Sequence, residues 1–432
     1  MIKNIFRVFV EKKSIALLCM AVCIYQGLVF SNLHANDPNM QSFLAEYYNS
    51  HEKNQKSYSK LLYAIDKGYK SLAITLLEKG ENPNYLPQNQ NISTPFLLAV
   101  YKEEEELVSA MINKGADVNL NAYLPHGEIV SPLSAATTNK SETITKLLCD
   151  FGAKPLGVSG VVQIWHHNPL GISIQRSDIL KFKIIANTLN DTEIKRLDKC
   201  GNSLLNLHMG WPISKQHILN TLEIAKYLIE RGVPLESGGQ SSLVTAINAG
   251  NGALFNLLLS YGADVNYMNH FMNSNTLIVA ICYYESSIDL VTQFPQCDGF
   301  IASPSEFIYA LLNAGAKHNL SFPEIRAVNY MLISKGFSPL NVAVDKQINE
   351  AVNILIGCGS DVNMIDSSGK TPLIIAVEKN NIEIVKSLLS FGADPTKEGG
   401  GYGNPIEIAY SNGYSEILSA LIESEALMYD YK

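Results

Sequence analysis

The chain contains few charged residues and has no run of basic ones. Of its 432 residues, 17% are Asp, Glu, Lys or Arg, and the formal net charge is -8. Proteins that bind nucleic acids usually carry a stripe of Lys and Arg, so this composition argues against a nucleic-acid partner. Hydrophobic residues make up 47% of the chain. That proportion is enough for a large core and argues against global disorder.

Cysteine is also scarce, and the sequence has no Cys-x-x-Cys motif. Five of the seven cysteines follow residue 35, and because five is odd, at least one of these thiols is unpaired within the chain. Cys282 and Cys297 could form a disulfide in an exported protein, because disulfides persist in oxidising compartments. Two free thiols are the favoured alternative, since spacing alone does not set connectivity.

Motifs of well-known catalytic chemistry are missing. The sequence has no Gly-x-Ser-x-Gly, no His-Glu-x-x-His and no phosphate-binding P-loop. The glycine-rich run Gly399–Gly403 lacks the Lys-Ser/Thr of a P-loop, which favours a flexible loop tip. The pair His166 and His167 has no acidic or cysteine partner nearby, which favours a structural or surface role over metal binding. We therefore predict no catalytic residue, no metal and no cofactor.

The N-terminus has the pattern of an export signal. Basic residues, among them Lys3 and Arg7, precede an apolar run of 16 residues, Ile15–Phe30. A run of this length is short for a membrane span and suits a signal peptide. We predict cleavage after Ala35 and no stable membrane insertion afterwards, so the protein would be periplasmic or secreted. An uncleaved N-terminal anchor is the alternative. Residues 36–57 are expected to be a polar, flexible lead-in.

Two short patterns recur along the rest of the chain. The first is Thr-Pro-Leu followed three residues later by Ala, as in Thr371–Ala376, and it returns at Thr94, Ser131, Ser338 and Asn404. The second is Leu-Leu-x-x-Gly-Ala-Asp, as in Leu388–Asp394. Its glycine recurs, with variation around it, at Gly80, Gly115, Gly152, Gly232, Gly262, Gly315, Gly359 and Gly392.

Each recurring position of these patterns has a physical role in a helix. Thr, Ser or Asn is a good N-cap, and proline at the first helical position sacrifices no needed donor. Ile384, Val385, Leu388 and Leu389 form one apolar stripe at helical spacing. The glycine that follows suits a left-handed C-cap, and Asp-Val-Asn then favours a turn. The unit is therefore helix, turn, helix and extended turn.

These units resemble the ankyrin-repeat family, whose repeat has about 33 residues and a Thr-Pro-Leu-His-x-Ala motif. The histidine of that motif is replaced here by Ile374, Leu97, Ser134 or Asn341. The resemblance implies an all-α solenoid of about ten helix-turn-helix units with hairpin-like loops. It covers residues 58–425, followed by a C-terminal tail, 426–432. Within it we expect an irregular centre, 153–205, and insertions at 283–304 and 319–336.

The resemblance also implies a non-enzymatic protein that binds partner proteins on the concave face of the solenoid. Matching positions on the first helices and the loop tips give the expected partner-binding residues: Tyr101, Lys102, Asn248, Tyr267, His270, Asp345, Lys346, Lys370, Glu378, Lys379 and Tyr402. The sequence predicts an exported interaction scaffold, a monomer, bound to another protein. A secreted effector that binds host proteins is one alternative. An enzyme or metal site hidden in the irregular centre is another.

Overall fold

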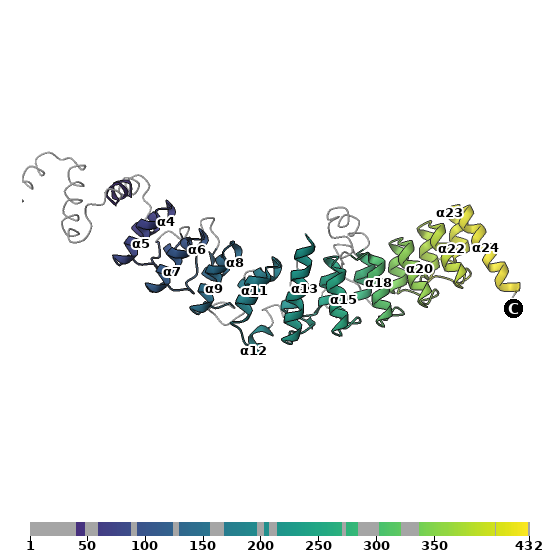
Figure 1. The fold of residues 1–432 in the computed structure, drawn as a ribbon. Helices are drawn as coiled ribbons and strands as arrows, with labels where there is room; N and C mark the ends of the chain where they lie inside the picture. The colour runs from purple at the N-terminus through teal and green to yellow at the C-terminus, as the bar shows by residue number, and fades with distance from the viewer. Residues whose placement is uncertain are drawn as a thin grey trace, which may run out of the picture. The chain divides into compact units, whose positions relative to one another are not determined.

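The computed structural model describes residues 40–47, 59–87, 93–123, 129–155, 168–196, 203–206, 214–269, 274–283, 302–320, 337–401 and 403–430. The expected signal peptide, 1–35, lies outside these ranges, as do His166, His167 and Cys297. The described chain is mostly helical, as expected, with a few two-residue strands (Figure 1). None of its described helices is both long enough and apolar enough to cross a membrane.

The chain divides into two compact units, Met1–Ala135 and Ala136–Lys432. The first unit contains helix pairs and one small antiparallel hairpin, in which Ala122 faces Val130. Its elements are α4 (Lys60–Asp66), α5 (Lys70–Glu78), α6 (Pro95–Tyr101), α7 (Glu105–Asn113), β1 (Ala122–Tyr123) and β2 (Ile129–Val130). Helix α8 (Pro132–Thr138) spans the boundary between the units.

A short helix at residues 40–47 packs against the first pair of helices in this unit. Phe43 and Tyr47 are buried, and their rings lie 5.7 and 5.5 Å from the ring of Tyr63. The Glu46 carboxylate accepts hydrogen bonds from the hydroxyls of Tyr63 and Tyr69, at 3.1 and 3.0 Å. This differs from the flexible lead-in that the sequence suggested. The segment is polar on average, but its two aromatic rings are four residues apart and share one helix face.

The second unit is a longer series of helix pairs. Its helices are α9 (Glu142–Asp150), α10 (Pro169–Gln175), α11 (Ile179–Ala186), α12 (Asp191–Ile194), the 3-10 helix η2 (Leu204–Asn206), α13 (Lys215–Glu230), α14 (Ser242–Asn248), α15 (Gly252–Ser260), α16 (Thr276–Cys282), α18 (Pro304–Asn313), α19 (Pro339–Asp345), α20 (Asn349–Gly357), α21 (Pro372–Glu378), α22 (Ile382–Ser390), α23 (Pro405–Asn412) and α24 (Ser415–Asp430). Two hairpins join β3 (Glu236–Ser237) to β4 (Gln240–Ser241) and β5 (Met268–Asn269) to β6 (Ser274–Asn275).

Local side-chain chemistry starts and stops these helices as the sequence predicts. The Thr371 hydroxyl accepts from the amide of Ile374 at 3.2 Å, which caps α21, and Pro372 is its first helical residue. Asn275 caps α16 in the same way, through the amide of Ile278 at 3.0 Å. Gly392, after α22, has a φ of 87°. Glycine adopts this left-handed conformation without a steric penalty, so it ends the helix cleanly.

Neighbouring pairs bury their apolar stripes on one another. In the C-terminal part of the second unit the first helices α19, α21 and α23 pack in sequence, and so do the second helices α20, α22 and α24 (Figure 1). The repeated alanines Ala343, Ala376 and Ala409 are fully buried between them. A residue this small lets adjacent helices approach closely, and the stacked stripes form a continuous core.

Asparagine side chains connect the loops of consecutive repeats. The Asn363 amide donates to the Gly392 carbonyl at 3.0 Å, and its oxygen accepts from the Asp394 amide at 2.9 Å. Asn266 makes the equivalent bonds to Gly315 and Lys317, at 3.1 and 2.8 Å. In the first unit Asn84 does the same with Gly115 and Asp117. These bonds satisfy backbone groups that a turn would otherwise leave unpaired.

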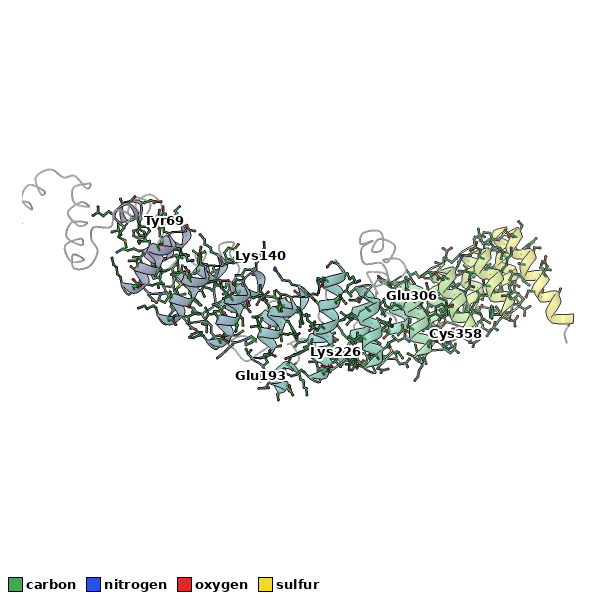
Figure 2. The ribbon with its side chains drawn as sticks, viewed as in Figure 1. Tyr69, Lys140, Glu193, Lys226, Glu306 and Cys358 are labelled. Atoms are coloured by element: carbon green, nitrogen blue, oxygen red, sulfur yellow. The ribbon has the colours of Figure 1, made fainter. Side chains whose placement is uncertain are left out.

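The two expected insertions lie largely outside the described residues, but the flanks of the first are visible. Tyr283 follows α16, and the described chain resumes at Ala302, just before α18. The Ala302 amide donates to the Gly250 carbonyl at 3.2 Å. A Cβ on residue 252 would lie only 2.6 Å from the Cβ of Ala302. Glycine at this position therefore allows the start of α15 to pack closely against Ala302. Glu306, labelled in Figure 2, completes the capping box of α18.

Candidate interaction surface

Four of the predicted contact residues pair with one another in the second unit. Asp345 is the last residue of α19 and Lys379 directly follows α21, on the next repeat. Their Oδ1 and Nζ atoms lie 2.9 Å apart. Within α21 and the loop before it, Lys370 Nζ lies 2.8 and 2.9 Å from the two carboxylate oxygens of Glu378. Exposed pairs of this kind add little stability, about 0–1 kcal/mol, so their main effect is to fix side-chain positions.

A similar contact links the first two repeats of the first unit. Lys102, which follows α6, donates to the carbonyl of Ile65 at 3.0 Å and lies 3.9 Å from Asp66. In the second unit Arg176 donates to the Thr138 carbonyl at 2.7 Å. In each case a cation after one first helix reaches the C-terminal end of the preceding one, where the helix dipole is negative. The sequence analysis did not indicate Asp66 or Arg176 as contact residues. The repeat that contains Asp66 lacks a clear Thr-Pro-Leu motif, and Arg176 lies in the irregular centre.

The other predicted contact residues are less connected. Tyr101 ends α6 and its side chain is 41% exposed, which leaves its ring accessible. Asn248 ends α14, and its Oδ1 is buried without a hydrogen-bond partner among the described residues. Lys346 follows α19, and Tyr267 is half-buried beside β5. His270 and Tyr402 lie outside the described residues.

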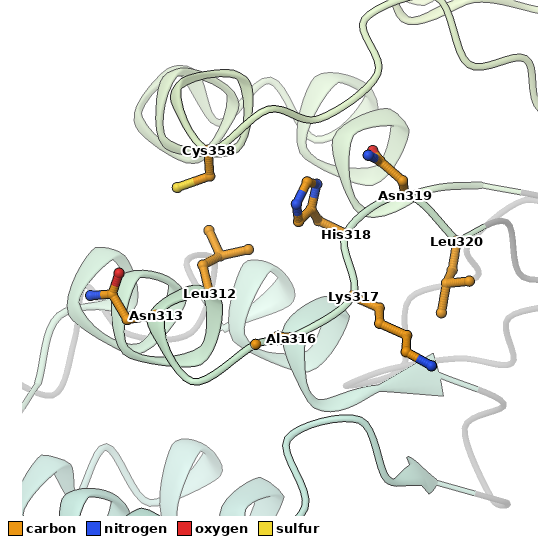
Figure 3. Close-up of a pocket in the computed structure, with 9 residues that line it drawn as sticks. Leu312, Asn313, Ala316, Lys317, His318, Asn319, Leu320 and Cys358 are labelled. Atoms are coloured by element: carbon orange, nitrogen blue, oxygen red, sulfur yellow. The ribbon is translucent and has the colours of Figure 1, made fainter.

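A pocket of about 670 Å³ lies between the C-terminal ends of α18 and α20. Its lining includes Leu312, His318 and Cys358, and Figure 3 shows Lys317 pointing away from Cys358. His318 Nδ1 lies 3.1 Å from Ser360 Oγ, which fixes the orientation of the ring. The volume suits a side chain or a small ligand. The sequence did not indicate this pocket, because its two walls come from different repeats.

One cluster, formed by Ser177 of the irregular centre and two residues of the following helix α13, resembles a catalytic pair. Ser177 Oγ lies 3.0 Å from His217 Nε2 and 2.6 Å from Thr221 Oγ1. Thr221 donates its single hydroxyl hydrogen to the His217 carbonyl at 2.9 Å. Ser177 must then donate to Thr221, and His217 Nε2 must donate to Ser177.

In this arrangement His217 supplies a hydrogen to Ser177 and does not remove one, so it is not placed as a base for this serine. Asn220 also donates to the Ser177 carbonyl, at 2.9 Å. Together these bonds hold the turn between α10 and α11 against the long helix α13. Burial lowers the pKa of His217, which favours its neutral form. Among the described residues, no group of three or more His, Cys, Asp or Glu side chains is placed to hold a metal ion.

The C-terminal part of the second unit matches a known family. Residues 303–399 and 340–430 match the family described as ankyrin repeats (3 copies). This part of the chain is therefore similar to ankyrin repeats. Such repeats generally mediate protein–protein interactions and typically belong to non-enzymatic scaffolds. No curated protein sequence shows significant similarity to the chain.

Proposed function

We propose that this protein is a non-enzymatic scaffold that holds a partner protein on its first-helix surface. That surface is defined here, in the second unit, by Asp345, Lys346, Lys370, Glu378 and Lys379. The observation that carries the proposal is the pairing of Asp345 with Lys379 and of Lys370 with Glu378 within the ankyrin repeats. Fixed polar side chains on a rigid helical support lose little entropy on binding, and this favours specific contacts.

We further propose that the repeat array extends beyond the matched residues, over about ten units between residues 58 and 425. The support is the recurrence of the same devices outside residues 303–430. Thr94 caps α6 through the amide of Leu97 at 3.1 Å, and Asn84 links two loops of the first unit. Export to the periplasm or beyond is also part of the proposal, and it rests on the N-terminal sequence pattern alone.

The binding surface can be tested by exchanging the charges of its ion pairs. One variant of the full chain carries Asp345→Lys with Lys379→Asp, together with Lys370→Glu and Glu378→Lys. Each pair can still form, so stability is preserved while the charge pattern presented to a partner is reversed. The control exchanges Lys183 with Glu223, an exposed ion pair between the second helices α11 and α13. All three proteins serve as baits in envelope and culture extracts.

We expect the wild type and the control to retain the same partner and the first-helix variant to lose at least about 90% of it, a tenfold change in affinity. Equal retention by all three baits would reject the first-helix surface as the binding site. Export is tested separately, by N-terminal sequencing of the protein from the producing cell. A chain that begins at Asn36 supports export, and a chain that begins at Met1 contradicts cleavage.

A further inference from the structure

The last described repeat exposes apolar side chains at positions that are buried in earlier repeats. Tyr410 on α23 corresponds to Val377 on α21, and Ile422 on α24 corresponds to Ile356 on α20, which is 3% exposed. Val377 is fully buried, whereas Tyr410 is 76% exposed and Ile422 is 50% exposed. Ile406 and Leu418, on the same face, are half-buried. We call these four residues the end face.

Within residues 403–430, every charged residue near the end face is acidic. Residues 403–430 contain no Lys, Arg or His, and Glu407, Glu423 and Glu425 lie beside the apolar side chains in sequence. Glu416 is paired with Lys386 on the preceding repeat, at 2.9 Å, so it contributes little to the field on this face. An apolar surface with an uncompensated negative border favours an apolar ligand that carries positive charges.

Glu407 argues against a further repeat as the occupant. The equivalent position in other repeats holds Leu97, Ile278, Asn341 and Ile374, all buried and uncharged. Stacking another repeat here would bury the Glu407 carboxylate, which is costly without a cation. A second copy of the chain is disfavoured for the same reason, since face-to-face stacking would bring the acidic borders of both copies together.

The first unit shows how the chain covers an end of this kind. There, helix 40–47 lies on the first helix pair with Phe43 and Tyr47 buried. Its Glu46 adds polar contacts to Tyr63 and Tyr69 at the edge of the apolar surface. A single amphipathic helix, with apolar residues four apart and a polar edge, is therefore sufficient to cover the end of a repeat array.

We propose that the end face is a second docking site, which binds an amphipathic helix of a partner protein with Lys or Arg beside its apolar stripe. Leu418 and Ile422 are four residues apart on α24 and form one ridge, and Tyr410 stands beside it on α23. The ligand helix would lay its apolar stripe along this ridge and place its cations near Glu407, Glu423 and Glu425. This site is separate from the first-helix surface and does not depend on it.

The test measures binding of a defined peptide to the full chain by fluorescence anisotropy. The probe is a labelled 18-residue peptide with Leu on one helical face and Lys on the other, compared with the same peptide carrying Glu in place of Lys. The variant combines Tyr410→Ser with Ile422→Ser. The matched control is Phe391→Ser, which removes a ring that is 57% exposed just after α22. Circular dichroism checks that each variant remains folded.

We expect the Lys peptide to bind the wild type and the control with the same affinity. Its affinity for the double variant should be at least about tenfold lower, and its affinity for the wild type should fall in high salt. The Glu peptide should not bind. Equal binding of the Lys peptide to the double variant would overturn the proposal, and so would equal binding of the Glu peptide. Self-association of the wild type that is lost in the double variant would identify a second copy as the occupant and would also overturn it.

Discussion

At the scale of single residues, the residue that begins the first helix of each repeat is usually proline but not always. Proline occupies this position in six of the described first helices, among them α6, α19 and α21, whereas Ser242 and Thr276 occupy it in α14 and α16. Both hydroxyls are buried without a hydrogen-bond partner among the described residues. A buried polar group left unpaired costs about 1–3 kcal/mol, so both positions carry a local defect.

Thr276→Pro should stabilise the protein by about 1 kcal/mol, because it removes the unpaired hydroxyl and restricts the unfolded chain. The preceding residue, Asn275, already has the extended backbone that proline requires, with φ -85° and ψ 169°. Ser242→Pro is the matched control. The Ser242 amide donates to the Leu235 carbonyl at 3.1 Å, and proline would remove that bond. The midpoint of thermal unfolding should be higher for Thr276→Pro than for the wild type, and lower for Ser242→Pro than for Thr276→Pro. The reverse order would contradict this explanation.

His217 should make stability dependent on pH. Burial lowers its pKa in the folded protein below the ordinary value, so between the two pKa values the unfolded chain binds more protons. Stability is then highest above the ordinary histidine pKa and falls as the pH drops through it. His217→Gln removes this titration and keeps a side-chain donor for Ser177. Unfolding midpoints at pH 7.5 and 5.5 should differ more for wild type than for the variant, and an equal difference would show that His217 does not contribute.

At the scale of elements, the turn between the two helices of a repeat contains a left-handed residue in most of the described repeats. Gly68, Gly250 and Gly413 fill this position with φ between 64 and 78°. Other repeats place Glu103, Ser177, Gln347 or Asn380 there, with φ between 49 and 60°. A residue other than glycine, asparagine or aspartate is strained in this conformation, so the turns at Glu103, Ser177 and Gln347 store energy that glycine would release.

Gln347→Gly should therefore stabilise the protein by about 0.5–1 kcal/mol, because the relief of strain exceeds the extra entropy of glycine in the unfolded chain. The Gln347 side chain is exposed, so little packing is lost. Asn380→Gly is the control, since asparagine tolerates the left-handed region well. Its stability should change less than that of Gln347→Gly in denaturant unfolding. An equal or larger gain for Asn380→Gly would show that backbone strain is not the cause.

At the scale of the whole molecule, each helix pair packs mainly on its sequence neighbours, so stability should be transmitted locally. Leu388→Ala removes a fully buried side chain from α22 and should cost about 2–5 kcal/mol in that region. Hydrogen exchange should speed up in α20, α22 and α24 much more than in α9 and α11. The counterpart Leu148→Ala, in α9, should show the opposite distribution. Uniform loss of protection in both variants would indicate one cooperative unit instead.

Much of the fold could be predicted because its signals are local. A cap such as Thr371 acts on an amide three residues away, and Gly392 ends its helix through its own φ. The helix at residues 40–47 was not predicted, since its two aromatic rings form a buried face only by packing on Tyr63 and Tyr69. The polar average of that segment concealed one apolar face. In the candidate surface the sequence indicated Asp345 and Lys379 separately and did not indicate that they form a pair.

The amino-acid sequence by itself determined the helix pairs and the similarity of residues 303–430 to ankyrin repeats, because capping, helical periodicity and glycine turns depend on neighbours along the chain. Only the tertiary structure decided which charged side chains pair across repeats, which cluster holds Ser177 and His217, and which apolar positions stay uncovered at Tyr410 and Ile422. Those properties depend on which repeat lies beside each residue in space. A repeated motif places the same residue types at the same positions, so neighbours in the stack alone distinguish a buried position from an exposed one.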